Sequence, residues 1–122
     1  MTNKANSFLV LLTFICFSSI PAASVANQEE SLTELEQGRE LAFTRSKGNC
    51  LACHIIEGGE LMGNYGPPLM FMKARFPDRD VLRSQIWDAS VKNYETRMPP
   101  FGRNRILTDE EIDLITDFIL TL

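Results

Sequence analysis

Cysteine and histidine are scarce in this chain of 122 residues, which has three cysteines and one histidine. Three cysteines are too few for the disulfide framework on which many small secreted domains depend. A single histidine excludes any site within the chain that needs two imidazole ligands. A basic surplus is also missing, because twelve Lys and Arg stand against sixteen Asp and Glu, a net charge of -4. That balance argues against a nucleic-acid binder.

Long apolar runs are missing as well. The run Phe8–Phe17 is much shorter than the roughly twenty residues that a transmembrane helix needs. The small residues of Ser24-Val25-Ala26 follow it, and this order is typical of a cleaved export signal. We therefore expect a signal peptide at residues 1–26, a periplasmic location, and one domain at residues 27–122 with no membrane segment in the mature form. A retained membrane anchor is the alternative.

The first half of this domain opens with a predicted helix. The capping-box pattern at Ser31–Glu34 predicts its start. Its expected buried face consists of Leu32, Leu35, Leu41 and Ala42. Gly38 interrupts this segment, and we expect another helix to cross close over it unless the glycine is merely tolerated. Glycines and prolines between Glu57 and Pro68 then predict a long loop.

The second half alternates predicted helices with loops. A short helix is predicted at Met70–Arg75. Asp80 is the predicted N-cap of a longer helix, whose apolar residues are Val81, Leu82, Ile86 and Ala89, with Tyr94 as a further candidate. A capping box at Thr108–Glu111 opens the final helix, with Ile112, Ile115, Phe118, Ile119 and Leu122 on one face. With no alternating strand pattern, we predict an all-α fold of three to five helices with long loops.

The segment Cys50-Leu51-Ala52-Cys53-His54 is a C-x-x-C-H motif, the attachment pattern of c-type haem. Two thiols at this spacing can form thioethers with the two vinyl groups on one porphyrin edge. The adjacent imidazole then reaches the iron as an axial ligand. We predict one covalently attached haem c, bound through Cys50 and Cys53, with His54 on the iron. Its free ring N–H should donate to a backbone carbonyl, and Pro67 is the favoured acceptor.

Three other kinds of site can contain two cysteines at this spacing. A structural zinc site needs four ligands, whereas the motif supplies three. A thioredoxin-like redox pair expects a βαβ context, and none is predicted here. A disulfide across this spacing would close a very small loop and constrain little.

The second axial ligand must be a methionine if it comes from this chain, because no second histidine exists. The methionines after the motif are Met62, Met70, Met72 and Met98. Met98 is far enough along the chain to reach the opposite haem face, and Pro99-Pro100 would stiffen the loop that presents it. Met98 is therefore the predicted ligand, while Met62 and an open coordination site remain alternatives. The cations Lys73, Arg75, Arg79 and Arg83 are interpreted as a solvated face.

Several blocks of the sequence together resemble the SoxX family of class I cytochromes c. They are GRELAFTRSKGNCLACH, GGELMGNYGPPL, MKARFPDRDVLRSQIWDAS and MPPFGRNRILTDEEID. Members of that family are monohaem subunits of the SoxAX cytochrome of sulfur oxidation. The resemblance implies a class I cytochrome c fold, covalent haem on Cys50 and Cys53, and iron ligation by His54 and Met98.

The same resemblance implies an activity and a set of partners. SoxAX couples thiosulfate oxidatively to a cysteine of the SoxYZ carrier, which makes it an L-cysteine S-thiosulfotransferase. The expected partners are a SoxA-like haem-bearing catalytic subunit, a SoxYZ-like carrier protein and a downstream electron-acceptor cytochrome. This chain would contribute no catalytic residue and would relay electrons. A free-standing periplasmic electron shuttle and a haem-based sensor are the alternatives.

Overall fold

The computed structural model describes residues 32–122. Its helices are α1 (Glu34–Phe43), α2 (Met72–Arg75), α3 (Arg79–Trp87) and α4 (Asp109–Ile119), with two short 3₁₀ helices, η1 (Cys50–Ala52) and η2 (Ala89–Val91). These residues contain no strand, and the predicted all-α class is confirmed. No helix among them is both long enough and apolar enough to cross a bilayer. The expected signal peptide, residues 1–26, lies outside the described part of the chain.

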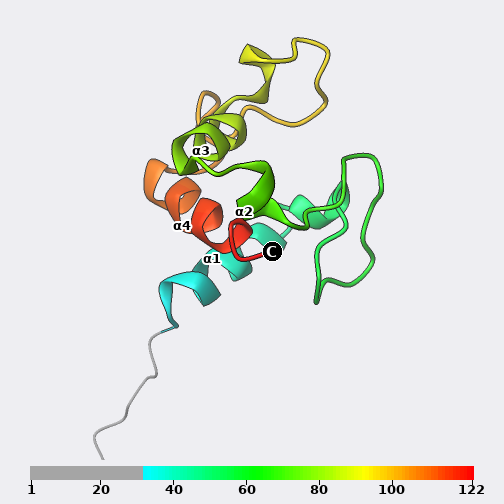
Figure 1. Ribbon diagram of the computed structural model, residues 1–122, viewed down its shortest axis with the longest axis vertical. Helices are drawn as coiled ribbons and strands as arrows, with labels where there is room; N and C mark the ends of the chain where they lie inside the picture. Colours follow the sequence, from blue (N-terminus) through cyan, green and yellow to red (C-terminus); the bar gives the residue numbers. More distant parts are fainter. Residues whose placement is uncertain (1–31) are drawn as a thin grey trace, which may run out of the picture.

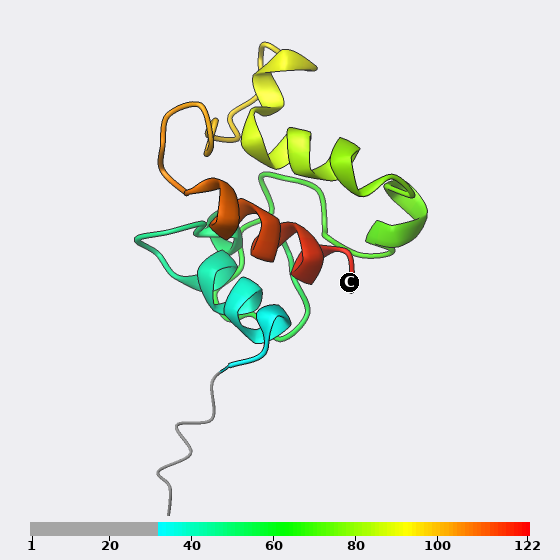
Figure 2. The same cartoon turned by 90° about the vertical axis from the view of Figure 1, so that its left-hand side faces the viewer.

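Helix α4 is the centre of the fold, with α1 and α3 packed on either side of it (Figures 1 and 2). Four of the five residues of its predicted apolar face are buried, namely Ile112, Ile115, Phe118 and Ile119. The fifth, Leu122, lies beyond the end of the helix and is partly buried against the core. The predicted capping box of Thr108 and Glu111 is also confirmed. Helix α1 crosses α4 at Gly38, where a Cβ atom would overlap the carbonyl oxygen of Leu114. The predicted close helix crossing is therefore present.

The predicted start of α1 was wrong, and its predicted buried face was right only in part. Thr33 is the N-cap, and it forms a reciprocal capping box with Glu36. Glu36 lies three residues after Thr33, so the sequence contains two overlapping patterns of the same type, and Ser31 lies outside the described residues. Leu32 and Leu35 are each 47% exposed, whereas Ala42 is buried and Leu41 is partly buried against the core.

Helix α3 starts and ends earlier than predicted. Asp78 is its N-cap, and the Asp78 carboxylate accepts a hydrogen bond from the backbone N–H of Asp80 at 2.9 Å. The helix ends at Trp87, and Ala89 is buried in the separate helix η2. Tyr94 lies in the following loop and is 87% exposed, so it takes no part in the helix face.

Charged side chains join α3 to α4 along their outer surface. Arg79 Nε lies 2.6 Å from a carboxylate oxygen of Asp117, and Arg83 Nε lies 2.9 Å from Asp113. Asp109 also contacts Arg83, at 3.1 Å. Two of the four cations expected on a solvated face are thus paired with the acidic side of α4.

This ion-pair network predicts a dependence of stability on pH. Hydrogen bonds from Arg83 and Arg79 hold the pKa of Asp113 below its ordinary value of 3.8. Asp113 therefore stabilises the fold above that pH, and this contribution is lost as the pH falls through the lower folded-state value. Because these side chains are partly exposed, the effect should stay below about 1 kcal/mol.

Denaturant unfolding of the wild-type protein and of Asp113→Asn, at neutral pH and in acid, measures this contribution. We expect the wild type to be the more stable at neutral pH and the difference to shrink in acid and in high salt. A constant difference between the two proteins at every pH would contradict this role of Asp113.

Candidate functional site

The C-x-x-C-H motif forms one tight turn. Residues Cys50–Ala52 make the helix η1, preceded by Asn49 in the left-handed conformation at φ 47°. The carbonyl oxygen of Cys50 accepts hydrogen bonds from the backbone N–H groups of Cys53, at 3.2 Å, and of His54, at 2.9 Å. Both cysteines are free thiols and partly buried. The two thiols and the imidazole are thus held within a single compact turn, as the predicted haem attachment requires.

The structure offers little to the zinc and redox-pair interpretations. Burial raises the pKa of the Cys50 thiol to about 11, although a bound metal ion itself deprotonates a coordinating thiol. Among residues 32–122, no three His, Cys, Asp or Glu side chains form a cluster that would hold a metal ion. The same residues contain no strand, so the βαβ context of a thioredoxin-like pair is not found in them.

The His54 ring is fixed by the predicted partner. Its Nδ1 atom lies 2.7 Å from the carbonyl oxygen of Pro67, which confirms that prediction. A carbonyl oxygen only accepts hydrogen bonds, so Nδ1 carries a proton in this contact, and in the neutral imidazole Nε2 then has the free lone pair. This is the tautomer in which Nε2 can ligate a metal.

The loop after the motif folds back against it. The backbone N–H of Gly63 donates to the Leu51 carbonyl, and that of Gly66 donates to the Cys53 carbonyl, both at 2.7 Å. A Cβ atom on Gly66 would lie 2.7 Å from Nδ1 of His54 and closer still to the neighbouring ring carbon. Glycine at this position therefore lets the backbone approach the imidazole and bring the Pro67 carbonyl within reach.

The methionines after the motif lie in different surroundings. The Met62 sulfur accepts a hydrogen bond from the backbone N–H of Ile56 at 3.2 Å. Met72 is a core residue, 1% exposed. Met98 is partly buried against the core in a loop that, with the loop after the motif, extends toward the same side of the helices (Figure 1). The ligand role of Met98 remains a prediction.

An ion pair that the sequence did not predict, Asp88 with Arg103, joins the end of α3 to the loop that carries Met98, residues 98–103 (the Met98 loop). Asp88 is 3% exposed, and one of its carboxylate oxygens lies 2.8 Å from Nη1 of Arg103. The local pattern of aspartate two residues before serine was a usable signal, because such a carboxylate often accepts a hydrogen bond from the backbone N–H two residues on. Asp88 makes that bond to Ser90 at 3.0 Å.

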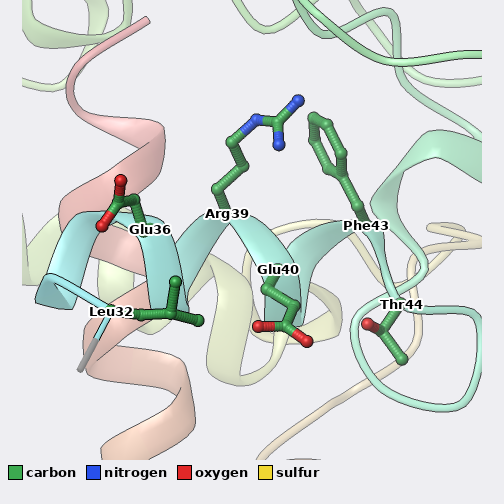
Figure 3. Close-up of a pocket in the computed structure, with 6 residues that line it drawn as sticks. All are labelled: Leu32, Glu36, Arg39, Glu40, Phe43 and Thr44. Atoms are coloured by element: carbon green, nitrogen blue, oxygen red, sulfur yellow. The ribbon is translucent and has the colours of Figure 1, made fainter. Parts of the chain in front are cut away.

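A separate shallow pocket lies beside α1 and contains none of the predicted site residues. Figure 3 shows its lining residues Leu32, Glu36, Arg39, Glu40, Phe43 and Thr44. The Arg39 guanidinium lies 4.5 Å from the centre of the Phe43 ring and donates to the Gly58 carbonyl at 3.0 Å. Arg39 therefore ties α1 to the loop after the motif.

The donor set as a whole fits a c-type haem. Two free thiols and an imidazole with an available Nε2 atom occupy one turn, and a partly buried thioether lies in the loop before α4. A family model described as "Cytochrome C oxidase, cbb3-type, subunit III" matches residues 33–119, a range that includes Cys50, Cys53, His54 and Met98. No curated protein matches the chain significantly.

Proposed function

The chain belongs to the family of cytochrome c domains described as cytochrome c oxidase, cbb3-type, subunit III, and from this premise we propose that it is the electron-accepting subunit of a SoxAX-like complex. As a cytochrome c domain it carries covalently bound haem c and transfers electrons. The word oxidase is part of the family's description and is not carried over to this chain. The narrower proposal is supported by the four sequence blocks that resemble SoxX and by the chemistry of the residues themselves.

The single observation that carries the electron-transfer role is the 2.7 Å contact between Nδ1 of His54 and the carbonyl oxygen of Pro67. This contact places a proton on Nδ1 and fixes the orientation of the ring. In the neutral imidazole the Nε2 lone pair is then held in one direction, ready to bind a metal. In this proposal Cys50 and Cys53 hold the haem by thioethers, while His54 and Met98 occupy the two axial positions. When bound, haem iron supplies reversible one-electron exchange.

The axial pair determines which chemistry is available. If His54 and Met98 both ligate the iron, the bound haem would offer no vacant site to oxygen or peroxide, and methionine ligation would raise its reduction potential. Both features would favour electron transfer over oxygen activation. The chain's own residues then have limited tasks: Cys50 and Cys53 would retain the haem, and His54 and Met98 would ligate its iron.

The cysteine count suits a relay and not a sulfur carrier. Once Cys50 and Cys53 are thioethers, residues 27–122 have no other cysteine and cannot hold a sulfur substrate covalently. In the proposed reaction a sulfur–sulfur bond forms between thiosulfate and the carrier cysteine. The thiol proton leaves and two electrons are removed. The covalent step is assigned to the partner subunit, and this chain accepts the electrons one at a time and passes them to another cytochrome.

Purification of the chain from its native periplasm tests this proposal. We expect a larger haem-bearing protein to copurify with it, and thiosulfate together with the carrier protein to reduce its haem only when that partner is present. A monomer that is purified alone, and is reduced and reoxidised by other redox proteins without any partner, would contradict the proposal and indicate a free-standing shuttle.

A further inference from the structure

The buried carboxylate of Asp88 joins two segments of the chain. Asp88 caps the end of α3, and its Oδ1 atom accepts hydrogen bonds from the Ser90 hydroxyl at 2.6 Å and the Ser90 backbone N–H at 3.0 Å. Its other oxygen pairs with Arg103 at 2.8 Å. Arg103 lies in the turn that follows Met98 and the two prolines. One carboxylate thus connects the end of α3 to the loop that carries the predicted iron ligand.

Backbone and aromatic contacts join the same two segments at the adjacent position. The N–H of Gly102 donates to the Trp87 carbonyl at 3.0 Å. A Cβ atom on Gly102 would overlap the Trp87 indole ring, so the loop lies directly against that side chain. Phe101, one residue earlier, is buried in the core at 7% exposure. Three consecutive residues at the end of the Met98 loop, Phe101, Gly102 and Arg103, therefore attach it to the core and to the end of α3.

The ion pair between Asp88 and Arg103 has one buried and one exposed partner. The Asp88 side chain is 2% exposed, whereas that of Arg103 is 53% exposed. The hydrogen bond from the Ser90 hydroxyl outweighs the effect of burial, and with Arg103 it holds the pKa of Asp88 below its ordinary value. The carboxylate is thus charged at neutral pH. A buried charge that loses its partner is costly, so the loop is held where Arg103 can reach Asp88.

We propose that Asp88 and Arg103 are positioning residues for the axial ligand: their ion pair holds the loop of residues 98–103 against the end of α3 and keeps the Met98 thioether on the iron. The proposal rests on the ligand role given to Met98 above. A thioether is a neutral and weak ligand, so its occupancy depends on the loop that presents it. Loosening the loop raises the fraction of time in which the iron has an open position.

The experiment compares matched holo-proteins. Asp88→Asn keeps the shape of the side chain and removes its charge, Arg103→Gln removes the other charge, and Arg103→Lys restores a cation. Asp117→Asn is the control, because it makes the same chemical change in an ion pair between α3 and α4 that involves no residue of the Met98 loop. The measurements are carbon monoxide binding to the reduced protein, the absorption signature of methionine ligation in the oxidised protein, and thermal unfolding.

We expect Asp88→Asn and Arg103→Gln to bind carbon monoxide about tenfold faster than the wild type, as for the loss of a contact of about 1.4 kcal/mol, and to weaken the methionine signature. Arg103→Lys should recover most of the wild-type behaviour, and Asp117→Asn should change thermal unfolding alone. Equal carbon monoxide rates in Asp88→Asn and Asp117→Asn would overturn the positioning role.

A parallel measurement on Met98→Ala separates this inference from the ligand assignment. If Met98→Ala opens the iron while Asp88→Asn does not, the ligand is correct and the positioning role is wrong. If Met98→Ala leaves ligand binding unchanged, the ligand assignment fails and the positioning role fails with it.

Discussion

Replacement of Met98 by alanine should let the reduced protein bind carbon monoxide rapidly and should lower the reduction potential of the haem. The physical reason is that, with Met98 as the proposed ligand, alanine would leave the iron without a protein ligand on that side. Since axial ligands set haem potentials over a range of about 0.8 V, we expect a fall on the order of 0.1 V or more. Carbon monoxide mixing and a redox titration measure the two effects.

Met70→Ala is the matched control for this experiment. Met70 is 47% exposed, and it lies in the segment that precedes α2. Its replacement also removes a thioether but should leave the potential and carbon monoxide binding unchanged. If Met98→Ala itself behaves like the wild type, the ligand lies elsewhere. Met62 would then be tested next, although its sulfur contacts the Ile56 N–H in this structure.

Replacement of Gly38 by alanine should destabilise the protein by about 3 kcal/mol, because the new methyl group overlaps a buried neighbour. On an isolated helix the same change would add stability of up to about 1 kcal/mol, since alanine is the better helix former. The sign of the effect therefore reports the helix crossing. The overlapping atom is the Leu114 carbonyl oxygen of α4, a backbone atom that cannot turn away as a side chain would.

Chemical denaturation of the holo-protein measures the free energy of unfolding for Gly38→Ala. Glu40→Ala is its control, because Glu40 lies on the same helix and is exposed, so its replacement should change stability by less than about 0.5 kcal/mol. Unchanged or increased stability of Gly38→Ala would mean that α1 and α4 are not in close contact at this residue.

The sequence predicted best those features that depend on local chemistry. The capping box at Thr108 and the apolar face of α4 follow from short-range patterns and are present. The C-x-x-C-H motif is likewise a short-range pattern. The acceptor of the His54 ring lies thirteen residues away along the chain, and it was predicted because a ligating imidazole usually donates its other ring N–H to a carbonyl or carboxylate. The match of the family model over residues 33–119 bears out the cytochrome c class.

Features that depend on competition or on tertiary contacts were predicted less well. At the start of α1 two capping patterns overlap, and the later one is used. Leu32 and Leu35 stay exposed, which depends on what packs against this end of the helix and not on the local pattern. At α3, Asp78 and Asp80 are both good caps, and the earlier one is used. The pairing of Asp88 with Arg103 joins two irregular segments, and no periodic pattern in the sequence places such residues together.

We infer that the protein carries an iron porphyrin bonded covalently to Cys50 and Cys53. Extraction of the purified protein with acidified organic solvent tests it most directly, with the intact mass measured before and after. We expect the colour and the mass of one haem to stay with the polypeptide, and to be absent from a Cys50→Ala, Cys53→Ala variant. A colourless protein, or pigment that passes into the solvent, would contradict the account.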